Sequence, residues 1–145
     1  MRGDLHEAVA DRLRQLEQRY TRGRRSVIDV LAAARGPLTI PEILAADRSL
    51  AQSSAYRNLA ELEQLGVIHR IVTDADHARF ELAEELTGRH HHHLVCSSCG
   101  TVVDVALPDD VEATLDDELA RLAGAHRFRA EHHRLDLVGT CQRCR

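Results

Sequence analysis

The feature that most constrains this chain is its cysteine content, which consists of two C-x-x-C pairs. The pairs are Cys96 with Cys99 and Cys141 with Cys144, and they account for all 4 cysteines. Two such pairs brought together place four thiolates at the corners of a tetrahedron, which is the geometry of a structural zinc site. A zinc ion bound in this way would tie the end of the chain to its middle. We therefore expect a fold in which the two pairs are neighbours.

A run of histidines, residues 90–93, lies shortly before the first cysteine pair. Histidine is the commonest metal ligand among side chains, and alternate side chains of a strand share a face. In a strand, His91 and His93 would point one way and His90 and His92 the other. One run can therefore supply two separate metal sites. The alternative is a solvated run that binds metal loosely.

Composition limits the class of protein. The chain has 145 residues, enough for one ordinary domain or two small ones, and 43% of them are hydrophobic. It lacks a signal-peptide pattern and any apolar stretch long enough to span a membrane. We therefore expect a cytoplasmic protein with no membrane partner, in which paired cysteines bind metal instead of forming disulfides.

Charge is distributed unevenly along the chain. The net charge is −4, and the acidic surplus falls in the second half, whereas the first half is neutral. The first half also carries a local basic run that comprises Arg19, Arg22, Arg24 and Arg25. A neutral half with a basic run can bind DNA, and an acidic half with His and Cys suits cations. The alternative for the run is a solvated start of a helix.

Hydrophobic spacing predicts helices in the first half at residues 4–19, at about 22–35 after a Thr21 cap, behind Thr39, and at 53–64 before Gly66. Strands at 67–72 and 78–82 flank a turn at 73–77. This order predicts a winged helix-turn-helix, whose second helix enters the major groove. A helical bundle with an incidental hairpin is the alternative.

The second half begins with a polar linker at residues 83–89. Strands are predicted at 91–95 and 101–105 on either side of the first cysteine pair. A helix is predicted from Pro108 to about Ala123, and an alternating pattern predicts a further strand at 127–138. Helices and strands therefore alternate in an α+β arrangement.

Three motifs in this order resemble the ferric uptake regulator family of metal-dependent transcription factors. They are SAYRNL at 54–59, the His run with LVCSSCG at 94–100, and HHRL at 132–135 with GTCQRC at 139–144. The resemblance covers nearly the whole chain and implies a homodimer of α+β fold. Residues 1–82 would be the winged-helix DNA-binding domain, 83–89 a linker, and 90–145 a metal-binding α/β dimerisation domain.

The resemblance also implies metal ligands. The four cysteines match the family's structural zinc site. A regulatory site for a second divalent metal, Zn or Fe, would lie between the domains and use Glu81, His91 and His93. His69 matches a ligand position of zinc-sensing members, and Asp104 resembles the aspartate of peroxide sensors. A third site would comprise His90, His92, Glu112 and His133.

Two departures leave the branch of the family open. The stretch 36–39 lacks the His that many iron-sensing members place before the third helix. The end of the wing lacks the Cys that zinc sensors often carry there. The iron-sensing, zinc-sensing and peroxide-sensing branches therefore all remain candidates.

The resemblance implies DNA contacts as well. Tyr56 and Arg57 are similar to recognition-helix residues that touch bases, since Arg can bind guanine and an aromatic ring can pack on a thymine methyl. Ser53 and Ser54 would bind phosphate at the helix start. Arg19 would lie where the family reaches the minor groove. The alternatives are core packing for Tyr56 and a simple surface charge for Arg57.

These expectations describe a metal-dependent repressor of metal-uptake genes. One alternative is a peroxide-responsive, iron-loaded repressor of the same fold, and another is a metal-storage protein that does not bind DNA. We expect no enzymatic activity, because a catalytic zinc needs an open position and a nearby base. A four-cysteine site has no open position, and the His run is not part of an H-E-x-x-H motif.

Overall fold

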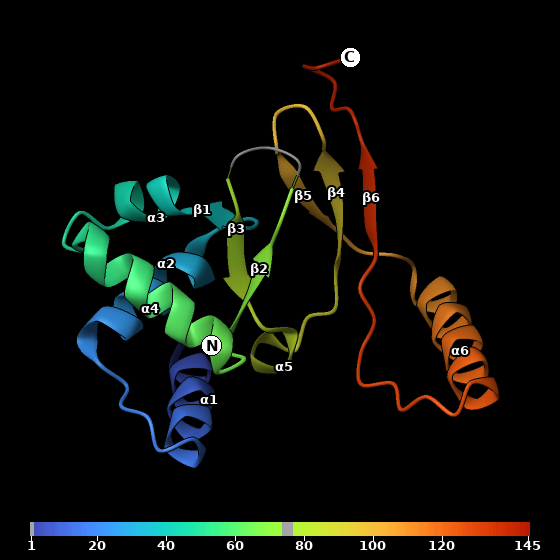
Figure 1. Cartoon of the computed structure of the whole chain (residues 1–145), viewed down its shortest axis with the longest axis horizontal. Helices are drawn as coiled ribbons and strands as arrows, with labels where there is room; N and C mark the ends of the chain where they lie inside the picture. Colours follow the sequence, from blue (N-terminus) through green and yellow to red (C-terminus); the bar gives the residue numbers. More distant parts are fainter. Residues whose placement is uncertain (1, 74–76) are drawn as a thin grey trace.

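The protein is described by a computed structural model that covers residues 2–73 and 77–145. It has an N-terminal part of four helices and a small sheet, and a C-terminal part with a second sheet and one long helix (Figure 1). The two parts are connected through a single helical turn, α5 (Glu84–Thr87). The α+β fold predicted from the sequence is confirmed.

The N-terminal part is a winged helix. Its helices are α1 (Arg2–Gln15), α2 (Arg22–Ala33), α3 (Ile40–Ala46) and α4 (Gln52–Gln64). Its sheet has the strand order β1-β3-β2 and consists of β1 (Leu38–Thr39), β2 (Ile68–Ile71) and β3 (Arg79–Leu82). The predicted turn between β2 and β3 falls largely on residues 74–76, outside the described residues. Helices and hairpin share one apolar core that includes Leu13, Ile28, Ile43, Leu59 and Phe80.

Local signals explain where these helices begin and end. Thr21 caps α2 by accepting a hydrogen bond from the backbone N–H of Arg24 at 3.3 Å. Thr39 and Glu42 form a reciprocal capping box at the start of α3, as a threonine followed three residues later by a glutamate predicts. Gly66 follows α4 with φ +70, a left-handed conformation that favours glycine.

One helix boundary differs from the prediction. Helix α1 ends at Gln15 and not at residue 19, because the chain turns there and Glu17 adopts a φ of 56. The turn brings Tyr20 back to α1, where its hydroxyl lies 2.5 Å from Nδ1 of His6. Nε2 of His6 lies 2.8 Å from Asp29 of α2, so this polar chain fixes α1 and the 16–21 loop against α2.

The C-terminal sheet has the order β5-β4-β6. Strand β4 (His92–Cys96) is antiparallel to β5 (Val102–Val105) and parallel to β6 (Asp136–Gly139). Helix α6 (Asp109–Ala125) stands at the outer side of this sheet and buries none of its residues (Figure 1). Exposed apolar residues therefore gather on α6, on β6 and on the segment between them, among them Val111, Leu122, Phe128, Leu137 and Val138.

The segment 83–89 contains α5 at 84–87, which ends at Gly88 in the left-handed conformation. One prediction for this half needs correction. The predicted strand at 127–138 is confined to 136–139. Arg127 has a φ of 52 where the chain leaves α6, and residues 129–135 do not pair regularly with β4. The helices of the described residues are too short or too polar to span a bilayer.

Candidate metal centres and DNA-binding surface

The two cysteine pairs lie together at one end of the C-terminal sheet. Parallel pairing of β4 and β6 places Cys96 opposite Gly139, which brings the second pair beside the first. The backbone N–H of Cys141 donates to Sγ of Cys96 at 3.3 Å, and Sγ of Cys99 lies 3.8 Å from Sγ of Cys141. The four sulfurs all lie within 4.8 Å of one another.

The sulfur geometry fits a tetrahedral zinc ion. Four sulfurs at about 2.3 Å from zinc are about 3.8 Å apart, close to the Cys99–Cys141 separation. Hydrogen bonds from the backbone at Cys141 and Cys99 lower the pKa of Cys96 to about 6. A hydrogen bond with Ser98 lowers the pKa of Cys144, but contacts with Cys141 and Cys99 outweigh it and raise that pKa to about 11. Four adjacent thiols therefore do not all ionise easily unless a cation is bound among them.

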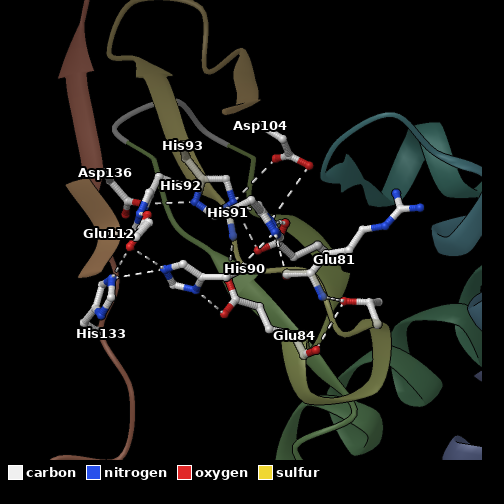
Figure 2. A network of polar contacts seen from close by, with 12 residues as sticks. Glu81, Glu84, His90, His91, His92, His93, Asp104, Glu112, His133 and Asp136 are labelled. Atoms are coloured by element: carbon white, nitrogen blue, oxygen red, sulfur yellow. Dashed lines mark hydrogen bonds and ion pairs between the residues drawn. The ribbon is translucent and has the colours of Figure 1, made fainter. Parts of the chain in front are cut away.

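A second cluster lies between the two parts of the chain and is called here the interdomain cluster. It joins Glu81 of β3 to His91, His93 and Asp104 of the C-terminal part (Figure 2). Nε2 of His91 lies 2.9 Å from Oε2 of Glu81, and Nε2 of His93 lies 3.1 Å from Oε1 of Glu81. Asp104 completes the group, with Oδ1 3.6 Å from Nε2 of His93 and Oδ2 3.9 Å from Nε2 of His91.

These separations suit a bound metal ion. Ligand atoms at about 2.0–2.2 Å from a tetrahedral ion are about 3.4 Å apart, within the range that the cluster shows. Oδ1 of Asp104 is buried without a hydrogen-bond partner, although it faces the imidazole of His93. An unpaired buried carboxylate oxygen is costly, and a cation in the cluster would satisfy it.

Protonation in the cluster reflects the same contacts. Burial lowers the pKa of His93, but hydrogen bonds to Glu81 and Asp136 outweigh it and raise the pKa to about 9. Burial also opposes the hydrogen bonds from the two imidazoles to Glu81, which nevertheless lower the pKa of that carboxyl. Burial and the nearby Glu81 raise the pKa of Asp104, against the attraction of His91. Protons bound to these side chains therefore occupy ligand atoms that a metal ion would need.

His69 lies outside this set of ligand atoms. It lines the same small pocket as Glu81, His91 and His93 but is not grouped with them. Its ring lies 6.4 Å from the ring of His132. The structure thus brings together Glu81, His91, His93 and Asp104, and it places His69 beside them on β2.

A third cluster, the outer cluster, lies on the opposite face of the His run and comprises His90, His92, Glu112 and His133. Nε2 of His90 lies 3.1 Å from Nε2 of His133, and His92 contacts Oε1 of Glu112 through Nε2. Oε2 of Glu112 is buried without a hydrogen-bond partner and lies 3.5 Å and 3.6 Å from Nε2 of His90 and His133. Alternation along the His run therefore divides its side chains between two clusters, as the strand geometry predicts.

Three carboxylates that sequence reasoning missed lie behind these imidazoles. Oδ1 of Asp136 is 3.0 Å from Nδ1 of His93, and Oε2 of Glu84 is 2.8 Å from Nδ1 of His90. Oδ1 of Asp116 is 3.3 Å from Nδ1 of His133. A carboxylate at Nδ1 fixes the ring and leaves Nε2 for a metal. Only the spatial pairing reveals them, because these acidic residues lie at unrelated distances along the sequence.

The predicted DNA-binding residues lie on α4 and on the 16–21 loop. Ser53, Ser54, Tyr56 and Arg57 are exposed on the first turns of α4, and the exposed fraction of Tyr56 is 50%. Core packing therefore does not account for Tyr56. The residue that caps α4 is Ala51, which supplies no side-chain hydrogen bond, so the start of this helix has no side-chain cap.

Not all of the basic run faces solvent. Arg24 is buried, and its guanidinium donates to Oε2 of Glu61 on α4 at 2.7 Å and to the carbonyl of Arg19 at 2.8 Å. The guanidinium of Arg25 lies over the ring of Tyr20 at 4.4 Å. Arg24 therefore fixes the 16–21 loop, whose Arg19 side chain is exposed, relative to α4.

Comparisons with known proteins agree with this architecture. The profile of the Ferric uptake regulator family matches residues 15–138. A ferric uptake regulation protein of Bordetella parapertussis is 32% identical over 102 residues, which cover 70% of this chain and 68% of the relative. A peroxide-responsive repressor of Staphylococcus aureus is 27% identical, over 97% of this chain and 91% of the relative.

Solved structures show the same fold. The ferric uptake regulator of Helicobacter pylori, reported with three functional metal binding sites, superposes with a TM-score of 0.72 at 22% identity. That match covers 99% of this chain and 93% of the other. A zinc-bound manganese uptake regulator superposes with a TM-score of 0.60 at 28% identity, covering 95% of this chain and 98% of the other. The chain belongs to the ferric uptake regulator family of metal-responsive transcriptional regulators.

Proposed function

We propose that this protein is a metal-dependent repressor that binds operator DNA and shuts metal-uptake genes when the cell holds enough metal. The observation that carries the proposal is the interdomain cluster, in which Glu81 belongs to the wing and His91, His93 and Asp104 to the C-terminal part. An ion bound there contacts both parts and fixes the angle between them. Metal binding thereby shifts a pre-existing equilibrium toward the form that fits DNA.

The repressor acts as a homodimer. The exposed apolar residues of α6, β6 and the segment between them support a dimer, because apolar residues that gather on a surface mark interaction sites. A second copy related by a two-fold axis would cover this surface on both chains. The dimer would then present two α4 helices, with Tyr56 and Arg57 toward bases, to successive turns of the major groove. The domain division is 1–82 and 90–145, with α5 in the connection.

The four cysteines bind a structural zinc. A site of four thiolates is closed and gives folding energy instead of catalysis. Zinc there ties Cys141 and Cys144, at the end of the chain, to the β4–β5 hairpin. The outer cluster of His90, His92, Glu112 and His133 is a further site for a divalent ion, one that connects the His run to α6.

The ligand set of the interdomain cluster best matches iron(II) or manganese(II) as the sensed metal. With Asp104 among the ligand atoms and His69 outside them, the interdomain cluster offers two imidazoles and two carboxylates. Carboxylate-rich sites suit harder ions such as Mn and Fe, whereas zinc is favoured by sites richer in nitrogen and sulfur. Zinc sensing would require His69 to move into the cluster in place of Asp104.

A peroxide-responsive repressor is the second candidate, and the position of Asp104 favours it. The family's peroxide sensors carry an aspartate that Asp104 resembles, and in those sensors hydrogen peroxide that reacts at the bound iron oxidises a ligand histidine. Iron-loaded protein treated with hydrogen peroxide should then gain the mass of one oxygen atom on a histidine of residues 90–93. Manganese-loaded protein is the control, and equal masses in both samples would reject this candidate.

Selection of DNA by the purified protein tests the main proposal. The zinc-loaded protein is mixed with fragments of random sequence, with manganese(II) or with a chelator too weak to remove the structural zinc. A dimeric repressor should enrich one palindromic sequence in the metal arm, because a two-fold dimer reads two half-sites. A metal-storage protein or an enzyme would enrich none. Enrichment that is equal in both arms would contradict metal dependence.

A further inference from the structure

Arg79, the first residue of β3, contacts both parts of the chain through one side chain. Its Nε donates to the carbonyl of Gly100 at 2.8 Å, and its Nη1 donates to the carbonyl of Pro37 at 3.2 Å. Nη1 also lies 3.2 Å from Oε2 of Glu42, and the Arg79 side chain is only 16% exposed. A guanidinium so far removed from water depends on these acceptors, so its position is set by both parts together.

Two of the three acceptors belong to elements that matter for the proposed function. Gly100 directly follows Cys99, has a φ of +73, and closes the first cysteine knuckle by donating to the carbonyl of Cys96 at 2.9 Å. Glu42 forms the capping box at the start of α3, the helix before the recognition helix α4. A short series of contacts therefore runs from the four-cysteine site through Arg79 to the helix-turn-helix.

An apolar contact also joins the wing to the C-terminal sheet. Ile71 of β2 lies opposite Arg79 in the register and packs with Val95 and Val102 of the C-terminal sheet, and all three are buried. This contact needs no metal. It contributes to keeping the wing against the β4–β5 hairpin near the knuckle.

Strand β3 thus attaches to the C-terminal part at two points. Glu81 reaches the interdomain cluster near His93 and Asp104, which pair with each other across β4 and β5. Arg79 reaches Gly100 at the turn that joins those two strands. One point of attachment leaves rotation free about every axis through it, whereas a second point leaves rotation only about the line that joins the two.

We propose that Arg79 is a positioning residue for DNA binding, which fixes the wing and the start of α3 against the cysteine knuckle. The orientation of the DNA-binding part then depends on the structural zinc site as well as on the sensed metal. This inference rests on the proposed function, because it assigns the orientation to DNA binding. Arg79 acts through Gly100 and Glu42 and does not itself contact DNA.

The test compares Arg79→Gln with Arg70→Gln in the zinc-loaded, manganese-saturated full-length protein. Arg70 is an exposed arginine of the paired strand β2 and serves as the matched control. Hydrogen exchange is followed in residues 37–42 and 97–101, and affinity is measured for the selected operator over a range of salt. Arg79→Lys is included because lysine can still reach one acceptor.

In the Arg79→Gln variant, the backbone amide hydrogens of both segments should exchange faster, and the structural zinc should be retained. The variant should bind the operator roughly tenfold more weakly, with an unchanged slope of affinity against salt. Arg79→Lys should lie between it and the parent. A slope reduced by about one would instead mean a direct phosphate contact and would overturn the positioning role. Exchange and affinity equal to those of the parent would overturn it too. If the parent itself shows no metal-dependent DNA binding, the proposed function fails, and exchange in the two segments still decides whether Arg79 connects them.

Discussion

Asp136 lies behind His93, with Oδ1 3.0 Å from Nδ1, while Nε2 of the same ring faces Glu81 at 3.1 Å. This pairing fixes which nitrogen of His93 faces the interdomain cluster. It also means that β6, from the far end of the sequence, orients a ligand on β4. The cluster therefore depends on three strands and not only on the residues that would touch the metal.

Replacing Asp136 should lower the metal affinity of the interdomain cluster without abolishing metal binding. In Asp136→Ala the ring of His93 loses its carboxylate partner, and loss of such partners typically costs about 10–100-fold in metal affinity. Manganese(II) titration of the zinc-loaded protein, followed by isothermal calorimetry, measures the change. Asp117→Ala, at an exposed position on α6, is the control. Equal affinities for both variants would show that Asp136 does not orient His93.

Metal affinity at this cluster should rise with pH. The pKa of His93 is about 9 in the metal-free protein, because hydrogen bonds to Glu81 and Asp136 outweigh burial. A metal must displace that proton, so affinity should increase by roughly tenfold per pH unit between pH ~7 and ~9. The free energy of unfolding of the metal-free protein should change the other way. The contribution of protonated His93 with its carboxylate partners is complete below pH ~6.5 and is lost as pH rises through about 9. Manganese affinity that is independent of pH would contradict the assignment.

The four-cysteine site should be structural and separable from the sensing site. Cys144→Ser should release one zinc per chain and weaken the dimer, because binding energy at such sites is folding energy of about 10 kcal/mol or more in small zinc domains. Zinc content by elemental analysis and mass by light scattering report the outcome. A stable, zinc-free dimer that still binds DNA would contradict the structural role.

DNA contacts should divide into those that read sequence and those that do not. Arg57→Ala should weaken operator binding by about 1–3 kcal/mol and relax the choice of base at one position. Arg19→Ala should weaken binding to all sequences and reduce the slope of log affinity against log salt by about one. Fluorescence anisotropy with the operator and a scrambled duplex separates the two. If both variants bind like the parent, α4 is not the recognition helix.

The sequence predicts the fold well where local signals act. Thr21, Thr39 and Gly66 mark helix boundaries through caps and a left-handed turn, and each lies where its residue type predicts. Strand alternation likewise predicts that the His run serves two clusters. The alternating pattern at 127–138 is misleading, because an exposed segment can alternate without being a strand, and only residues 136–139 form one.

Side-chain partners that come from distant segments could not be predicted. Arg24 reads as part of a surface basic run, yet it is buried because Glu61 and the carbonyl of Arg19 accept its hydrogen bonds. Arg79 and Asp136 likewise gain their roles from Gly100 and His93 across the fold. Sequence periodicity shows which face a residue occupies, but not which residue from another element lies opposite it.

The most direct test of the account is the coupling between the sensed metal and DNA. Manganese(II) affinity of the zinc-loaded protein is measured with and without saturating operator DNA, for the parent and for His91→Ala. If metal favours the DNA-binding form, linkage requires the operator to tighten metal binding by the same factor by which metal tightens operator binding, typically about 5–150-fold. We predict this coupling in the parent and its loss in His91→Ala, with the structural zinc retained in both. Equal metal affinities with and without DNA in the parent would contradict the central claim.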